Sequence, residues 1–444
     1  MNVLKALLLV FFLNFIYAQD CASVQSLYES NSYLEAYEKI LQLGDIISGN
    51  NDCTLLAYNI LFKLENFNEA KKYLDQLLQS DPNNSEYKQS SDLLTKVLQN
   101  YKSSKYTLEK IDINEAILEY EKILNDEELK DISLFHAGLA LAYKKKFMNS
   151  SLEDSLDFVL LDLSIANYNK AQSINKKYDD DILNIAKYLT NLGKQSMGND
   201  ELNKALSYFS KATEYDSSYS TAYFYLGQLY MKIQDYELAA ESYELGLGSR
   251  AKNGNYKVLY LLATCYQKLN KFDMAEKFFG YSIDNEPTYT KARFALSNLY
   301  YKQQKYDESK NNIFNIFNMD PEYIKAYELL VNIFLDTNDY NSARKYADKG
   351  ILINSKSYFL YSQLAFLDNE EKKYESAIFN ANEALSIKRN YGPALIALAT
   401  ANVYLCNRVA AEDAFKKARR YDRRQVKQLQ DWADDHFKSP ACKK

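Results

Sequence analysis

Hydrophobic and small residues recur along this chain with a period of about 34 residues. In each period a large residue stands three positions before a small residue, which we call the anchor. From Ala205 to Ala411 the anchors are separated by 34, 36, 34, 34, 34 and 34 residues. A fixed period of this size indicates a solenoid of stacked units, whose concave surface is long. The pairs are Tyr33/Ala36, Phe67/Ala70, Leu202/Ala205, Tyr236/Ala239, Phe272/Ala275, Tyr306/Ser309, Tyr340/Ala343 and Tyr374/Ala377.

Each period predicts two helices. Before the anchor Ala239, apolar side chains recur at spacings of three and four, and the same spacing follows it, at Tyr243 and Leu247. Such spacing places one apolar stripe on each helix. The small anchor lets the second helix approach the first closely. Pro287 and Pro321 follow second helices, and proline ends a helix because it lacks the amide donor.

These features resemble the tetratricopeptide repeat (TPR) family. The residues that carry the resemblance are Leu226, Gly227, Tyr230, Ala239, Tyr243, Pro287 and Pro321, with their counterparts in neighbouring repeats. The resemblance implies an all-α fold, a TPR-type α-solenoid in which antiparallel helix pairs form a right-handed superhelix.

The 34-residue period of the anchors divides the chain into segments. We expect N-terminal TPR-like repeats at 19–82 and seven regular TPRs at 187–423. Residues 83–186 are expected to form irregular helical repeats around Ala116 and Ser164, with insertions such as 144–157. A capping helix at 424–437 would cover the last apolar face and bury Trp432, and the tail ends at residue 444.

Composition agrees with a helical repeat protein. Glycine (12) and proline (5) are scarce among 444 residues, which fits long helices with short turns and disfavours a β-rich fold. Much of the abundant tyrosine (40) lies in the repeat frame, where packing between helices explains it. The net charge of −5 disfavours a general nucleic-acid or anionic-membrane binder, so no nucleic-acid partner is expected.

The N-terminus resembles a secretory signal peptide. Lys5 precedes an apolar run at 6–15, and Ala18 precedes a polar start, so we expect cleavage after residue 18. The alternative is an uncleaved anchor, although the run is shorter than the roughly 20 residues of a membrane span. No later segment is expected to cross a membrane. The protein is therefore predicted to be exported, and to be periplasmic, envelope-associated or secreted.

Export would make disulfides available to the five cysteines. Cys21 and Cys53 fall at nearly the same place on the first helices of adjacent repeats, so they could form a bridge. Cys406 and Cys442 could tie down the C-terminus, and Cys265 is expected to be a buried thiol. The alternative is that all five are free.

The sequence predicts no catalytic, cofactor or metal site. Its only histidines are His136 and His436, and no Cys-x-x-Cys, His-Glu-x-x-His, Gly-x-Ser-x-Gly or phosphate-loop pattern occurs. A hydrolase or transferase with its site in residues 83–186 is the alternative with least support.

Four rows of residues indicate a binding groove. Positions 18, 15, 11 and 7 before an anchor share one face of the first helix, and the family resemblance implies that this helix lines the concave side. In the same order, these rows are Thr221, Lys257, Lys291, Lys325; Phe224, Tyr260, Phe294, Glu328; Gln228, Thr264, Asn298, Asn332; and Lys232, Lys268, Lys302, Asp336.

The rows suit an extended, acidic peptide. Amides can pair with a peptide backbone, aromatic rings offer contact area, and lysines favour acidic side chains or a terminal carboxylate. The alternative is that most of these residues are common in the family whatever it binds, so the lysines at position −18 carry most of the weight. The likeness to co-chaperone carboxylate grooves is loose.

We therefore predict an exported, non-enzymatic TPR scaffold that binds a peptide or protein, within a cell-envelope assembly. The alternatives are an intracellular adaptor or co-chaperone, and an architectural spacer without a ligand. A basic patch offers a second surface, for an acidic partner or lipid headgroups, unless its charges only complement a helix dipole. It comprises Lys416, Lys417, Arg419, Arg420, Arg423, Arg424 and Lys427.

Overall fold

The computed structural model describes residues 21–44, 47, 50–150, 158–421 and 423–442. Within these ranges every regular element is a helix, and none of the helices is both long and apolar enough to cross a membrane. The expected signal peptide at 1–18 lies outside the described residues. The chain divides into two compact units, residues 1–222 and 223–444.

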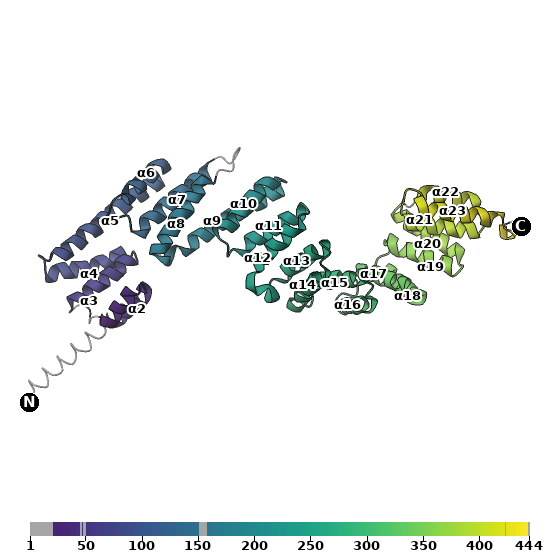
Figure 1. Ribbon diagram of the computed structural model, residues 1–444, viewed down its shortest axis with the longest axis horizontal. Helices are drawn as coiled ribbons and strands as arrows, with labels where there is room; N and C mark the ends of the chain where they lie inside the picture. The colour runs from purple at the N-terminus through teal and green to yellow at the C-terminus, as the bar shows by residue number, and fades with distance from the viewer. Residues whose placement is uncertain (1–20, 45–46, 48–49, 151–157, 422, 443–444) are drawn as a thin grey trace, which may run out of the picture. The chain divides into compact units, whose positions relative to one another are not determined.

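The N-terminal unit consists of helices that pack mainly against their neighbours in sequence (Figure 1). Residues 21–29 are helical and precede the first labelled helix. The elements that follow are α2 (Tyr33–Leu43), α3 (Asn51–Lys63), α4 (Phe67–Ser80), α5 (Ser85–Lys110), α6 (Ile113–Leu124), α7 (Ser133–Asn149), α8 (Val159–Ile174), η2 (Lys176–Tyr178), α9 (Asp179–Gly198) and α10 (Leu202–Tyr215).

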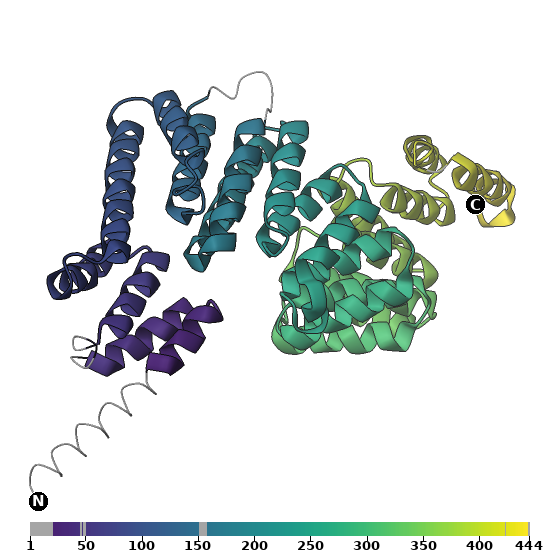
Figure 2. The same cartoon turned by 60° about the vertical axis from the view of Figure 1, so that its left-hand side comes forward.

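Helix α11 (Ser220–Lys232) runs across the unit boundary, and the C-terminal unit repeats one helix hairpin (Figure 2). Its further elements are α12 (Tyr236–Leu247), η3 (Gly248–Asn253), α13 (Tyr256–Lys268), α14 (Phe272–Asn285), α15 (Thr290–Lys302), α16 (Tyr306–Met319), α17 (Ile324–Asp336), α18 (Tyr340–Ile353), α19 (Tyr358–Glu370), α20 (Tyr374–Ile387), α21 (Gly392–Tyr404), α22 (Arg408–Ala418), α23 (Arg423–Lys438) and η4 (Pro440–Cys442).

The prediction of an all-helical solenoid built from helix pairs is confirmed for the described residues. From α13 to α22 each first helix packs against the second helix of its own repeat, and that second helix packs against the next first helix. Helix α23 packs on α21 and α22 and buries Val426 and Ala433. It closes the last apolar face of the stack, as a solenoid requires.

The anchors lie where paired helices meet. Ala239, Ala275 and Ser309 are fully buried, each in the first turn of a second helix. Gly227 on α11 serves the same close packing, because a Cβ atom there would lie 2.6 Å from the ring of Tyr243 on α12. The side chain of Tyr243 is itself fully buried.

We therefore expect Gly227→Ala to lower the free energy of unfolding by about 1–3 kcal/mol, the usual effect of overpacking. Gly280→Ala on α14 is the matched control, since no atom outside its own helix lies within 4 Å of the added Cβ. It should stabilise the protein by about 0.5–1 kcal/mol through helix propensity. Urea unfolding of both variants measures the difference, and equal effects would refute this role of Gly227.

The turn inside each regular repeat has one residue in left-handed conformation. It stands five positions before the anchor, with φ between 56° and 65°. In the turn after α15, Gln304 N–H donates to Tyr301 O and Lys305 N–H to Tyr300 O, each at 2.9 Å. This pairing is a Schellman motif, which satisfies the last carbonyls of the first helix. The residues at this position are Asn31, Glu65, Asp200, Gln234, Asn270, Gln304, Asn338, Lys372 and Cys406.

The segment 83–186 lacks this turn at its expected anchor. Ile111, five positions before Ala116, has φ −114°. The preceding helix α5 has 26 residues, twice the 13 of α13, so the 34-residue frame does not continue there. Residues 144–149 of the expected insertion at 144–157 continue helix α7. The rest of that insertion includes 151–157, which lie outside the described residues.

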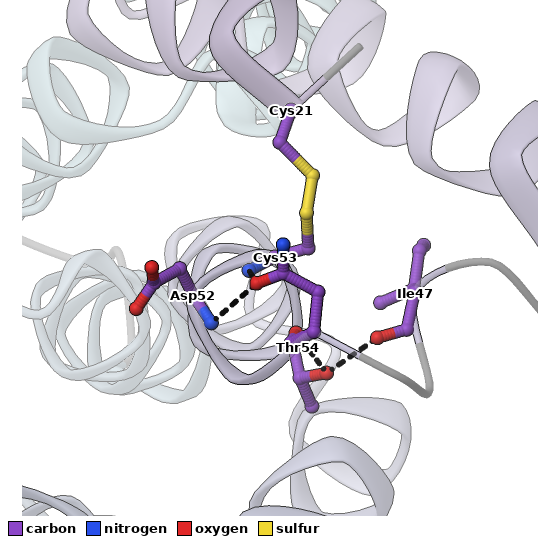
Figure 3. The surroundings of a disulfide bond; sticks show 6 residues. Cys21, Ile47, Asp52, Cys53 and Thr54 are labelled. Carbon is purple, nitrogen blue, oxygen red and sulfur yellow. Dashed lines mark hydrogen bonds between the residues drawn. A yellow bond between two sulfur atoms is a disulfide. The ribbon is translucent and has the colours of Figure 1, made fainter. Parts of the chain in front are cut away.

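Two disulfides staple the chain near its ends. Cys21 and Cys53 are joined with their Cα atoms 5.8 Å apart, and Cys406 and Cys442 with theirs 5.3 Å apart. Figure 3 shows the first bridge at the start of α3, where Thr54 Oγ1 donates to Ile47 O at 2.9 Å. The remaining cysteine, Cys265, is a buried free thiol, and burial raises its pKa to about 12.

Buried tyrosines make stability depend on alkaline pH. Burial raises the pKa of Tyr58 to about 12, and its hydroxyl donates to Ser90 O at 3.2 Å. In the unfolded chain the pKa is about 10, so the stability that this tyrosine contributes is fully present below about pH 10. That stability is lost as the pH rises through the folded-state pKa.

We expect Tyr58→Phe to flatten the fall in unfolding free energy between about pH 10 and about pH 12 by up to about 1.4 kcal/mol per pH unit. Urea titrations of both proteins across this range provide the measurement. Parallel pH profiles for the wild type and the variant would contradict the expectation.

Candidate functional site

The candidate site lies on the first helices α13, α15 and α17. At the backbone these helices approach one another, and α17 approaches α19, whereas successive second helices are farther apart. The first helices therefore line the inner side of this part of the stack. These helices carry the lysine, aromatic and amide rows.

Three exposed lysines stand at the same place on these helices. Lys257, Lys291 and Lys325 are each the second residue of their helix. Within the described residues none of them forms an ion pair with an acidic side chain. No acidic residue occupies the first turn of α13, α15 or α17.

This arrangement opposes helix stability. The N-terminus of a helix carries partial positive charge and favours acidic residues, each by about 0.3–1 kcal/mol. The second helices α14 and α16 follow this rule, since Asp273 lies in the first turn of α14, and Asp307 and Glu308 lie in that of α16. Helix α18 has no acidic residue in its first turn. A lysine at the start of three successive first helices therefore creates a positive surface that does not stabilise the fold itself.

The aromatic row at position −15 is half-buried. The ring of Tyr260 lies 5.9 Å from that of Phe279 in the core and 5.6 Å from that of Tyr289. Phe294 lies 5.5 Å from Tyr323. The expected ridge therefore packs in part between helices and is only partly exposed. The first residue of the row, Phe224, is likewise half-buried.

Tyr289 and Tyr323 pack against the rings of the aromatic row, although the sequence analysis did not select them. Both stand 20 positions before an anchor, as do Tyr219 and Tyr391, so their recurrence was a usable signal. Burial, then the neighbouring Tyr260, raises the pKa of Tyr289. Its hydroxyl therefore stays protonated at neutral pH and can donate a hydrogen bond.

The amide row holds both engaged and unengaged side chains. Thr264 Oγ1 already donates to Tyr260 O at 2.8 Å. The side chains of Gln228, Asn298 and Asn332 are half-buried and have no hydrogen-bond partner among the described residues. They can therefore pair with the backbone of a bound peptide.

The lysine row at position −7 is exposed at Lys232, Lys268 and Lys302 and ends at α17. There, Asp336 accepts a hydrogen bond from Tyr301 Oη at 2.8 Å. Glu328, in the aromatic row, accepts from Ser357 Oγ at 2.9 Å. Positive charge is therefore concentrated on α13 and α15, with Lys325 at its edge.

The basic patch near the C-terminus is partly used within the fold. Lys417 Nζ lies 2.5 Å from Asp413 on α22. Arg419 donates to Gln430 Oε1 at 2.8 and 3.2 Å, which joins α22 to α23. These contacts weaken the interpretation of this patch as a docking surface.

Two family models match the chain. The FAT domain model matches residues 48–246, and a tetratricopeptide repeat model matches residues 256–289, which hold the α13–α14 hairpin. The same hairpin, with its buried anchor and left-handed turn residue, recurs through the C-terminal unit. The chain is a tetratricopeptide repeat protein. Proteins of this family are generally protein-interaction scaffolds.

Solved structures resemble this TPR protein at low identity. A tetratricopeptide repeat protein from Parabacteroides merdae is 16% identical over 56% of this chain and 99% of that chain, with a TM-score of 0.45. YrrB, described as a TPR protein with an unusual peptide-binding site, is 25% identical over 44% and 95%, with a TM-score of 0.36. The Cut9–Hcn1 hetero-tetramer structure matches at 14% over 88% and 84%, with a TM-score of 0.38. No curated protein matches the chain.

Proposed function

We propose that this TPR protein is a non-enzymatic scaffold that binds an extended acidic segment of another protein along α13, α15 and α17. The observation that carries the proposal is the row of exposed lysines at three consecutive helix starts, where the helix dipole favours acidic residues. An anion bound there contacts both a lysine and the positive end of a helix.

Each row of side chains has its own role in binding the peptide. Lys257, Lys291 and Lys325 attract the acidic side chains and speed encounter. Asn298 and Asn332 pair with the peptide backbone, because their amides have no partner in the described structure. The partly exposed aromatic rings add apolar contact. This arrangement selects for charge and extended conformation rather than for a single sequence.

Fluorescence anisotropy with labelled peptides tests the proposal. An extended peptide rich in aspartate and glutamate should bind, and a lysine-rich peptide of equal length should not. Affinity for the acidic peptide should fall as salt is raised, since the contacts are exposed. Equal affinity for both peptides, or no binding of either at low salt, would refute the proposal.

We propose further that the protein is exported and works in the cell envelope or outside the cell. The signal-like segment at 1–18 supports this, and so do the two disulfides, because disulfides persist in oxidising compartments. The intact mass of the protein isolated from its native host is expected to equal that of a chain without residues 1–18. A mass that retains them, together with free thiols at Cys21 and Cys53, would favour the intracellular alternative.

A further inference from the structure

We propose that Cys406, His436 and Cys442, when reduced, form a site for one thiophilic divalent cation such as Zn²⁺. The two sulfur atoms and a ring nitrogen of His436 lie within 4.8 Å of one another, and all three residues are half-buried. No family pattern predicts this site, because the residues are 30 and 6 positions apart and come from three elements.

The fold holds each ligand in place. Cys406 occupies the left-handed turn between α21 and α22, with φ 61°, where its N–H donates to Val403 O at 3.0 Å. Cys442 lies in η4, directly after α23. His436 lies in the last turn of α23, and its ring packs 5.3 Å from Tyr404 and 5.8 Å from Trp432.

This ligand set suits a soft cation. Two thiolates and one imidazole are ligands that zinc takes in proteins, at about 2.3 Å for sulfur and about 2.0–2.1 Å for nitrogen. Small movements of the side chains would bring the three atoms to such distances around one ion. Three protein ligands leave the fourth tetrahedral position open to water or to a group from a partner.

The disulfide and the metal are alternative states of the same sulfur atoms. A phosphine reductant breaks the Cys406–Cys442 bond: the phosphine takes the oxygen of one water molecule, and the two protons of that water form two thiols. The cation then displaces both thiol protons as it binds the thiolates. A small-molecule disulfide oxidant takes two electrons from the two thiolates and is itself cleaved to two thiolates. This step re-forms the Cys406–Cys442 bond and releases the ion, so the site is occupied only under reducing conditions.

Cobalt(II) titration of the full-length protein, with a phosphine reductant, tests the inference, because cobalt in a thiolate site gives sulfur-to-metal charge-transfer absorption. One ion per chain should bind to reduced wild-type protein and none to the oxidised protein. His436→Ala should weaken binding by roughly 100-fold or more, since loss of a ligand exceeds the effect of losing an outer partner. Its recovery of two disulfides on reoxidation shows that the variant still folds.

The Cys21→Ser, Cys53→Ser double variant is the matched control, because it removes the other disulfide and leaves the proposed ligands intact. It should bind cobalt as the reduced wild type does. The inference is overturned if reduced wild-type protein shows no charge-transfer band. It is also overturned if His436→Ala binds equally tightly, or if the band disappears in the control.

Discussion

Simultaneous replacement of Lys257, Lys291 and Lys325 by glutamate is expected to weaken binding of an acidic peptide at least about 100-fold. Each substitution removes an attraction and adds a repulsion, and exposed pairs of charges contribute up to about 1 kcal/mol each. Three such changes together exceed the roughly 2.7 kcal/mol that a 100-fold change in affinity requires. Anisotropy titrations at low salt measure the effect.

A second triple variant distinguishes the effect of where the lysines lie from the effect of the protein's net charge. Lys277, Lys345 and Lys349 are exposed lysines on the second helices α14 and α18. Their replacement by glutamate changes the net charge equally but leaves the inner face intact, so affinity should fall only a few-fold. Circular dichroism should show unchanged helicity in both variants. Equal losses of affinity would mean that overall charge, and not the inner face, governs binding.

Loss of Glu65 is expected to destabilise the N-terminal unit by about 1–3 kcal/mol for each buried hydrogen-bond donor that it leaves without an acceptor. Its side chain is only 3% exposed in the turn between α3 and α4. It accepts a hydrogen bond from Tyr178 Oη at 2.7 Å, forms an ion pair with Lys177 and is hydrogen-bonded by Ser133. Burial, then the charge of Glu65, raises the pKa of Tyr178 well above its usual range.

Urea unfolding of Glu65→Ala measures this effect, and Glu69→Ala is the control. Glu69 also forms an ion pair, with Lys72 at 2.6 Å, but its side chain is 40% exposed. Exposed pairs contribute about 0–1 kcal/mol, so the control should differ little from wild type. A loss below about 1 kcal/mol for Glu65→Ala would show that the buried network does not stabilise this unit.

The sequence predicted the repeats well because their packing is local. Each anchor needs a small residue at a fixed distance from its partner helix, so Ala239 and Ala275 reveal the period directly. The left-handed turn position left no such signal. It holds nine residues of six types, including Glu65, Lys372 and Cys406, and glycine occupies none of these positions.

Contacts between distant segments could not be predicted from the period. Glu65 and Lys177 are 112 residues apart, and Lys177 lies within the irregular segment. The same holds for His436, which meets Cys406 and Cys442 only because α23 folds back on the last repeat. The sequence could predict the candidate groove because its lysines recur at the same position in successive repeats. The packing of Tyr260 against Tyr289 could be found only from the structure.

Site-specific photo-crosslinking in the native host would test most directly whether the inner face of α13, α15 and α17 binds an acidic protein segment. A benzophenone amino acid in place of Asn298, in the middle of this face, should form one discrete adduct, and mass spectrometry should place the crosslink in an acidic segment. The same group in place of Lys345, on α18, should not form this adduct. Equal adducts from both positions, or a crosslinked segment without acidic residues, would contradict the account.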